Sequence, residues 1–308
     1  MGRLPDLLKG GGVVRTIQKK RRSFRLSNLL ITLALCGMAL CGILPFIHML
    51  AVSFSSGRMS AQNLVGLWPL EFSVEAYKEA LGDTAMLRSV LVSLERVVLG
   101  TLITMVLTIL TAYPVSLESR EFPGRKFYVV YMVITMLFSG GLIPAYVLVS
   151  QLGMINTIWA LVVPGAIPIF NVIVLLNFYR GIPAEIREAA RIDGANDFRL
   201  LTQIYIPLST PCLATLTMFC IIGHWNAWFD GLMYMRDNTL YPLQTYLQVK
   251  LSSLNDIKSQ QDVVQMLLVS DRGLMYAYVA LSCIPILLVF PLLSRHIKSG
   301  LILGSVKG

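Results

Sequence analysis

Residues 127–179 read FYVVYMVITMLFSGGLIPAYVLVSQLGMINTIWALVVPGAIPIFNVIVLLNFY, and these 53 residues contain no Asp, Glu, Lys or Arg. A helix that crosses the ~30 Å hydrocarbon core of a bilayer needs about 20 apolar residues. As one helix, this stretch would be about 80 Å long, so it is predicted to cross the membrane twice. Gly140, Gly141, Pro144 and the polar residues around Ser150 mark where the chain is predicted to turn.

Four further stretches lack charged residues: Leu26–Gly57, Val97–Leu117, Leu200–Phe229 and Gly273–Ser294. Together they predict six spans, at approximately 28–52, 91–117, 127–149, 158–179, 204–223 and 274–294. The strands of a membrane barrel would alternate in polarity over about 10 residues instead of running continuously apolar. The predicted fold class is therefore an all-α integral membrane protein with six transmembrane helices.

The composition supports the same fold class. Of 308 residues, 55% are hydrophobic and only 14% are charged, whereas a soluble domain has about 25% charged residues. Low charge with abundant apolar residues also excludes a disordered chain. Fourteen prolines exclude an uninterrupted coiled coil.

Basic residues are unevenly distributed among the connections between the predicted spans. The formal net charge is +9, and eight basic residues precede residue 26, including Lys19-Lys20-Arg21-Arg22. Others lie in the loops after the second and fourth spans: Arg120, Arg125, Lys126, Arg180, Arg187, Arg191 and Arg199. Because basic residues near short loops stay in the cytoplasm during insertion, residues 1–26 are predicted to form a basic cytoplasmic segment before a membrane domain of residues 27–308. Both termini are predicted to be cytoplasmic. The basic run needs only membrane lipid as its partner, so nucleic acid is not expected.

The motifs of several enzyme classes are absent from the sequence. It contains no GxxxxGK[ST], GxSxG or HExxH pattern and no pair of candidate catalytic carboxylates. The five cysteines form no CxxC pair and the three histidines are widely separated, so no metal site or bound cofactor is expected. The chain is not expected to be an enzyme, and any work driven by ATP requires another chain.

The most informative loop joins the fourth and fifth predicted spans, where residues 181–198 read GIPAEIREAARIDGANDF. Pro183 suits the first position of a helix, and the acidic residues after it favour the helix N-terminus. Gly194 is typical of the left-handed residue that follows a helix, and Asn196 or Asp197 can cap a second helix. Two short helices that meet at a glycine turn are therefore predicted.

The small and apolar residues of this loop leave two interpretations open. Ala189 and Ala190 let another backbone come close, and Ile186, Ile192 and Phe198 add an apolar surface. The loop can pack on its own helix bundle, or it can dock onto another protein. The residue types alone do not distinguish between these interpretations.

The order of residues in this loop resembles the EAA loop of ABC-importer permeases. The family pattern is EAA-x3-G-x9-I-x-L-P, and the chain has Glu188-Ala189-Ala190, then Gly194, then Ile204-Tyr205-Ile206-Pro207. The one departure is Ile206 in place of leucine. Residues 188–195 are similar to the carbohydrate-uptake branch, and residues 138–144 and 223–229 resemble its complex-polysaccharide or oligosaccharide subgroup. The resemblance extends from about residue 25 to the C-terminus.

This resemblance implies a type I ABC-importer permease domain in the bacterial cytoplasmic membrane, with a cytoplasmic coupling helix inside the loop 180–203. It implies as partners a second homologous permease subunit, two ATPase subunits that bind ATP and Mg²⁺, and an external solute-binding protein. The outer loops, 53–88 and 224–273, are expected to form the docking surface for that binding protein. The residues that it assigns to ATPase coupling are Glu188, Ala189, Ala190, Asp193, Gly194, Ile204 and Pro207.

The resemblance implies a carbohydrate substrate, expected to be an oligosaccharide. Polar and aromatic residues in or beside the spans are the candidates to bind it. Candidates for the substrate path are Asn171, Asn177, Trp225, Asn226 and Trp228. Amide groups bind hydroxyls and aromatic faces pack on sugar rings, although tryptophan also anchors spans at the membrane surface. Glu95 and Arg96 lie near the outer face about 100° apart on a helix, so they are not expected to pair with each other. They are instead expected to extend to the membrane surface.

Two other functions compete with the importer. A membrane-embedded enzyme such as a lipid-linked transferase needs clustered carboxylates or histidines at one membrane face, and the sequence has none. A channel or secondary carrier for a small polar solute gives no reason for the EAA pattern, and the chain shows no two similar halves.

Overall fold

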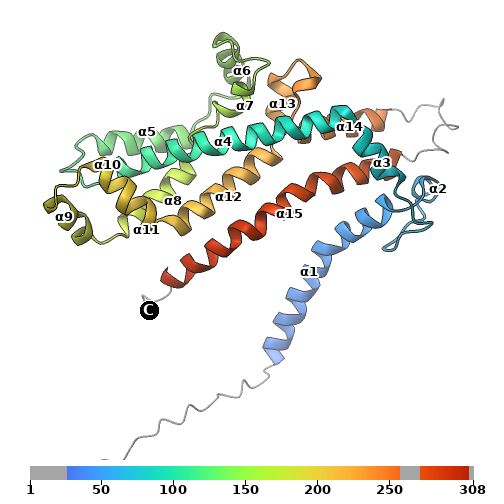
Figure 1. Ribbon diagram of the computed structural model, residues 1–308, viewed down its shortest axis with the longest axis horizontal. Helices are drawn as coiled ribbons and strands as arrows, with labels where there is room; N and C mark the ends of the chain where they lie inside the picture. The colour runs from blue at the N-terminus through green and yellow to red at the C-terminus, as the bar shows by residue number, and fades with distance from the viewer. Residues whose placement is uncertain (1–25, 257–270, 305–308) are drawn as a thin grey trace, which may run out of the picture. The chain divides into compact units, whose positions relative to one another are not determined.

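The computed structural model describes residues 26–256 and 271–304, and all regular structure within these ranges is helical (Figure 1). The chain divides into two compact units, residues 1–46 and 47–308. The predicted basic segment 1–26 lies almost entirely outside the described residues, as does part of the second outer loop. The loop 180–203 and the helices that surround it belong to the second unit.

In the described ranges, three helices are each long and apolar enough to cross a membrane. Three further pairs of helices, each bent at a short break, also pass this test, so the number of spans is up to six if each pair counts as one span. The three single helices are α1 (Leu26–Ser53), α4 (Thr84–Ser116) and α15 (Asp271–Gly304). They contain the predicted first, second and sixth spans. Helix α4 begins earlier than residue 91 because Asp83 caps it: its Oδ1 atom accepts hydrogen bonds from the Ala85 and Met86 amides, at 3.0 and 3.3 Å.

The third predicted span is broken near its middle. The structure has α5 (Arg125–Leu137) and α6 (Leu142–Gln151), whose axes are bent by 114°. Gly141 between them has a φ of +88°, in the left-handed region that residues with a Cβ rarely adopt. The turn predicted at Gly140 and Gly141 is therefore present, and it divides the predicted span 127–149 into two helices.

The fourth predicted span is also divided. Helix α7 (Ile158–Val162) ends before Pro164, and α8 (Ile169–Arg180) begins after Pro168. A proline lacks a backbone N–H and disfavours helical geometry in the residue before it. Two prolines so close together explain why a single helix over 158–179 was the wrong prediction.

The fifth span begins with a change of helix type. In order, the chain forms α10 (Asp197–Leu200), the π-helix η1 (Leu201–Tyr205), α11 (Ile206–Leu208) and α12 (Thr210–Asn226). The Ile206 amide donates to the Leu201 carbonyl, five residues earlier. Pro207 and Pro211 remove two backbone donors, and the chain bends by 81° at Ser209. The straight span therefore starts later than the predicted residue 204.

Helix α4 is the central element of the second unit. It packs against α8 and α12, and α12 packs in turn against α15 (Figure 1). The approach of α4 to α12 is so close that a Cβ added at Gly100 would lie 2.6 Å from the His224 ring. At one end of this bundle, Tyr205 makes edge-to-face contacts with Tyr113 and Tyr179, both at 5.1 Å between ring centres.

The two predicted outer loops gather at the other end of α4 and contain short helices. The first holds α2 (Gly57–Ala61) and α3 (Glu75–Gly82); the second holds α13 (Phe229–Tyr234), the 3₁₀ turn η2 (Asn238–Leu240) and α14 (Leu243–Asp256). The Leu243 amide donates to the Ser93 hydroxyl at 2.7 Å, which attaches the start of α14 to α4.

The Asp83 carboxylate joins three elements at this end. Its Oδ2 atom accepts hydrogen bonds from the hydroxyls of Tyr246 on α14 and Tyr278 on α15, and Lys250 lies 3.4 Å away. Partial burial opposes ionisation of Asp83, but these hydrogen bonds, the Met86 amide and the Lys250 charge together lower its pKa to about 2.

Because the folded pKa of Asp83 is below its unfolded value, its contribution to stability is complete above about pH 4 and is lost as the pH falls towards 2. We therefore expect Asp83→Asn to lower the thermal unfolding temperature of the purified chain at neutral pH. The difference from wild type should shrink as the pH falls below 4. Glu79→Gln, which removes an exposed carboxylate on α3, is the matched control. A difference from wild type that stays constant between pH 7 and pH 2 would contradict the role assigned to Asp83.

Candidate functional site

The loop 180–203 folds as two short helices around a glycine turn. Pro183 was predicted to be the first residue of a helix; it is instead the N-cap residue, so helix α9 (Ala184–Ile192) begins one residue later. Gly194 has a φ of +80°, and the Ala195 amide donates to the Ala190 carbonyl at 2.9 Å. This confirms the left-handed turn. Asn196 caps α10, since its side chain accepts a hydrogen bond from the Arg199 amide at 2.9 Å.

Helix α9 presents an apolar surface that the residues described by the structure do not cover. None of its residues is buried, and Glu188 and Ala189 are exposed. Ile192 is 86% exposed, and Phe198 on the neighbouring α10 is 71% exposed. A helix that only packed on its own bundle would bury such side chains. The geometry therefore favours docking of another protein over the self-contained interpretation.

The other residues assigned to coupling lie in different surroundings. Ala190 and Ile204 pack against the tyrosine-rich core at this end of the bundle, so they belong to the framework of the loop. Asp193 is the exposed C-cap of α9, and Pro207 is exposed just after the π-helix. The structure thus places Glu188, Ala189 and Pro207 on the surface, whereas Ala190 and Ile204 pack against the core.

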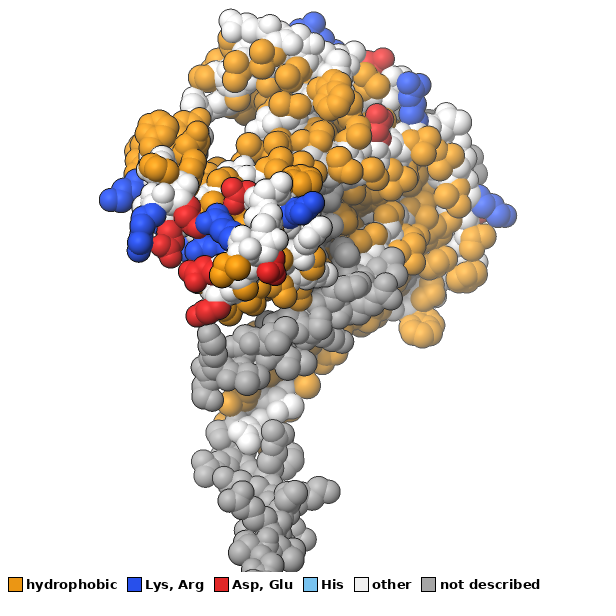
Figure 2. Space-filling model, turned by 60° about the vertical axis from the view of Figure 1, so that its left-hand side comes forward, with side chains coloured by type: hydrophobic (Ala, Val, Ile, Leu, Met, Phe, Trp, Pro, Cys, Tyr) orange, Lys and Arg blue, Asp and Glu red, His pale blue; other side chains and the backbone are white. Residues whose placement is uncertain are grey.

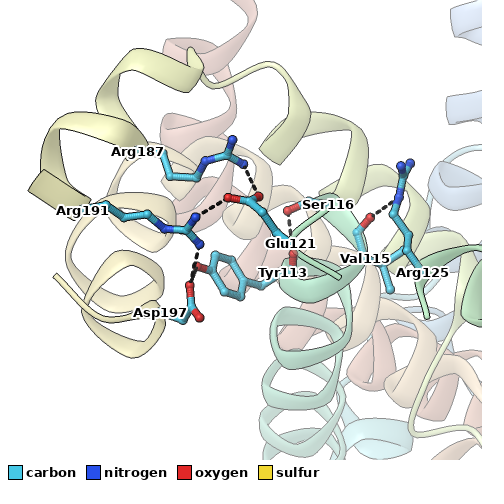
Figure 3. Close-up of polar contacts among 8 residues, drawn as sticks. All are labelled: Tyr113, Val115, Ser116, Glu121, Arg125, Arg187, Arg191 and Asp197. Carbon is cyan, nitrogen blue, oxygen red and sulfur yellow. Dashed lines mark hydrogen bonds and ion pairs between the residues drawn. The ribbon is translucent and has the colours of Figure 1, made fainter. Parts of the chain in front are cut away.

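An ion-pair network holds α9 against the loop that follows α4 (Figure 3). Glu121 binds Arg187 at 3.1 Å and also pairs with Arg191, one helical turn further along α9. Arg191 contacts Asp197 at 3.1 Å, and Asp197 accepts a hydrogen bond from the Tyr113 hydroxyl at 3.1 Å. The helix is therefore attached to α4 and its following loop as well as to the spans that it joins.

Glu121 was not among the residues predicted from the sequence. Glu121 belongs to no motif. One signal was available in the sequence: its loop and residues 180–203 are predicted to lie on the same side of the membrane, and its negative charge is opposite to that of the arginines in 180–203. Figure 2 shows side chains of both charges gathered at one place beside a broad hydrophobic surface. The pairing of Glu121 with the more buried Arg187 is less screened by solvent than its pairing with Arg191.

A cavity of about 500 Å³ lies among α4, α7, α8, α12 and α13. This volume is in the range of small-ligand sites. Its polar lining consists of Arg96, Thr104, Asn171, His224, Asp230 and Tyr234. Phe219, Pro164 and Pro168 are among the apolar residues that complete it. The cavity therefore combines a few convergent polar groups with apolar walls.

Arg96 lies inside the bundle and not at the membrane surface. Only 2% of the residue is exposed, and its guanidinium binds both carboxylate oxygens of Asp230, with one contact at 3.0 Å. It also donates to the Ala227 carbonyl at 3.2 Å. The prediction that Arg96 extends to the surface is wrong, because Asp230 at the start of α13 supplies a partly buried counter-charge. As expected, Arg96 does not pair with Glu95, which is exposed.

The structure brings one of the five predicted path residues to this cavity. Asn171 lines it, with its amide 3.4 Å from the Cys220 sulfur. Trp225 is buried elsewhere, among Leu243 and Tyr278, and its indole N–H donates to the Ser282 carbonyl at 3.2 Å. The remaining three, Asn177, Asn226 and Trp228, are exposed and lie outside the cavity lining.

Residues 85–235, which contain every lining residue of the cavity and the whole loop, match a family described as "Binding-protein-dependent transport system inner membrane component". The chain is 36% identical to the protein LplC of Bacillus subtilis, over 94% of this chain and 97% of LplC. It is 37% identical to YtcP of the same organism, a polygalacturonan/rhamnogalacturonan transport system permease protein, over 92% of this chain and 99% of YtcP. The chain belongs to this permease family.

A solved structure is similar to this chain along almost its whole length. It is described as a bacterial ABC transporter involved in the import of the acidic polysaccharide alginate. Its matching chain has 30% sequence identity and a TM-score of 0.81, and the match covers 89% of the present chain and 97% of the other.

Membership confirms the ABC-importer permease predicted from the EAA motif. The permease is a bacterial cell-membrane protein with an all-helical fold, and it is a transport subunit and not itself an enzyme. Relatives in this family are components of binding-protein-dependent systems, so the permease works with partner subunits. The channel or secondary-carrier alternative is not favoured.

Proposed function

We propose that this permease moves an oligosaccharide into the cell as one of two homologous but different membrane subunits. Two ATPase subunits, which bind ATP and Mg²⁺, and an external solute-binding protein complete the importer. The support for a carbohydrate is that YtcP is named for polygalacturonan and rhamnogalacturonan, and the matching solved importer for alginate. Under this proposal both termini and the loop 180–203 are cytoplasmic.

The main support for a role of α9 in ATPase coupling is the exposure of its apolar and small residues. Glu188 and Ala189 would contact a groove of the ATPase, Gly194 would make the turn, and Ile192 and Phe198 would be covered on docking. Closure of the ATPase dimer on ATP would then move α9. The energy enters as the different affinity of the ATPases for the two states of the membrane subunits.

The cavity among α4, α8, α12 and α13 is the proposed part of the sugar path in this subunit. The Arg96–Asp230 pair balances its charge, so an uncharged, hydroxyl-rich sugar unit can enter without an uncompensated charge. Asn171 and Tyr234 offer hydrogen-bonding groups in the lining. The Thr104 hydroxyl is buried and has no hydrogen-bond partner among the described residues.

Reconstitution of the purified importer tests this function. We expect the chain to co-purify with a second, different permease and two ATPases. Addition of glycan-loaded binding proteins should then stimulate ATP hydrolysis several-fold and drive uptake into vesicles. Binding proteins loaded with amino acids or peptides are the control. Stimulation by these solutes but by no glycan would overturn the substrate class, and a transport-competent homodimer of this chain would overturn the subunit composition.

A further inference from the structure

A second, smaller pocket lies at the base of α9, outside the cavity described above. It has a volume of about 230 Å³ and lies among the end of α4, the start of α5, the end of α8 and the start of α9. Its lining contains three arginines, Arg125, Arg180 and Arg187, and one carboxylate, Glu118. The side chains that line this pocket therefore carry an excess of positive charge.

Backbone and ion-pair contacts hold the three arginines while leaving donors free. Arg125 Nε donates to the Val115 carbonyl at 3.0 Å, and Arg180 donates to the same carbonyl at 3.5 Å (Figure 3 shows the first contact). Arg187 binds Glu121 through one terminal nitrogen. Since each guanidinium has five N–H donors, every one of these arginines retains donors for another acceptor.

One buried donor at the pocket, Nε of Arg187, has no hydrogen-bond partner among the residues that the structure describes, and the Arg187 side chain is 11% exposed. The hydroxyl-bearing Tyr179 beside the same pocket is 1% exposed. Buried donors without partners are rare and costly in folded proteins. Both residues line the pocket, so an anion placed there could accept hydrogen bonds from them.

We propose that this pocket binds a phosphate group, carried by the headgroup of an anionic phospholipid. Guanidinium groups bind phosphate oxygens through paired, charge-assisted hydrogen bonds. Basic pockets between the ends of membrane helices suit anionic headgroups, and α4, α5 and α8 all end or begin at this pocket. Inorganic phosphate shares the same chemistry and is the alternative source.

A phosphate at this position would join α9 to two membrane helices. Arg187 lies on α9, whereas Arg125 begins α5 and Arg180 ends α8. The anion would add a contact beside the Glu121 network and restrict rotation of α9. The effect of the bound phosphate on ATPase coupling rests on the proposed function of α9. Binding of the phosphate group itself does not depend on that function.

Lipid titration of the full importer complex tests the site directly. The complex in neutral detergent is titrated with phosphatidylglycerol or with phosphatidylcholine, and bound lipid is counted by native mass spectrometry. We expect Arg125→Gln and Arg180→Gln each to weaken phosphatidylglycerol binding about fivefold. Lys126→Gln removes an exposed positive charge next to Arg125 but outside the pocket lining, so it should have little effect.

A parallel titration with inorganic phosphate identifies the source. Competition by phosphate at millimolar concentration would support the phosphate site with a soluble occupant, and its absence would support the lipid headgroup. Equal weakening by Lys126→Gln, or equal binding of both lipids, would overturn the proposal. Because the readout is bound lipid, it does not depend on transport, and a wild-type complex that binds the lipid but imports no sugar would contradict only the proposed function.

Discussion

Asp230→Asn is expected to destabilise the permease by about 3–5 kcal/mol, because it leaves the Arg96 guanidinium charged and buried without a counter-ion. The Arg96 side chain is 3% exposed, whereas that of Asp230 is 27% exposed. The reverse change, Arg96→Met, should therefore cost less, since the remaining carboxylate can be hydrated. The double variant should recover much of the loss, because neutral residues of similar size often replace a buried ion pair at little cost.

Denaturant or thermal unfolding of the purified chain in detergent measures these differences. Glu95→Gln, at the exposed neighbouring position, serves as the control and should change stability by less than about 0.5 kcal/mol. If the two single changes cost the same and the double variant shows their simple sum, the pair is not coupled. That result would remove the explanation given for the buried arginine.

Gly194→Val is the second change with a large expected effect, and the effect is on transport. Gly194 has a φ of +80°, and no atom lies within 4 Å of the position that a Cβ would take. The cost is therefore backbone strain of about 1–2 kcal/mol, not a clash. This strain would shift the turn after α9, and with it the docking surface, so sugar uptake per ATP hydrolysed should fall by about tenfold.

Gly153→Val is the matched control for this prediction. Gly153 also has a positive φ, +67°, and open space around its Cβ position, but it lies after α6 and far along the chain from the loop. It should lose similar stability while keeping coupled uptake. Glu188→Lys, which places a positive charge on the exposed face of α9, should reproduce the uncoupling of Gly194→Val. Normal coupled uptake in both loop variants would refute the docking role of α9.

Local sequence determined the parts of the protein that depend on neighbouring residues. Hydrophobic length predicted the long helices α1, α4 and α15, since each crossing needs a continuous apolar run. The conformation of Gly194 and the cap formed by Asn196 were predicted because both depend on contacts within a few residues. The order of residues in the EAA loop was also enough to predict the permease family, which the comparisons confirmed.

Apolar runs were less informative about where the helices break. The glycine pair before α6 was predicted to mark a turn, whereas hydrophobicity alone could not show that the prolines around α7 interrupt the fourth span. Backbone dihedral angles and missing amide donors determine these breaks, and neither depends on how apolar the segment is. The break around α7 also shapes the cavity, because Ala160 and Leu161 on α7 and the two prolines that follow it all line the cavity.

Tertiary structure alone decided the pairing of charges. Arg96 meets Asp230 across 134 residues, and Glu121 meets Arg191 across 70. A single charged residue near the end of a span has the same local sequence whether it reaches the membrane surface or pairs inside the bundle. The outcome depends on which distant segment the helix packing brings within hydrogen-bonding distance, because burial of a charge is tolerated only where a counter-charge is supplied. For that reason the sequence by itself predicted the permease family and the glycine turn of its EAA loop, while the Arg96–Asp230 pair and the Glu121 network required the folded chain.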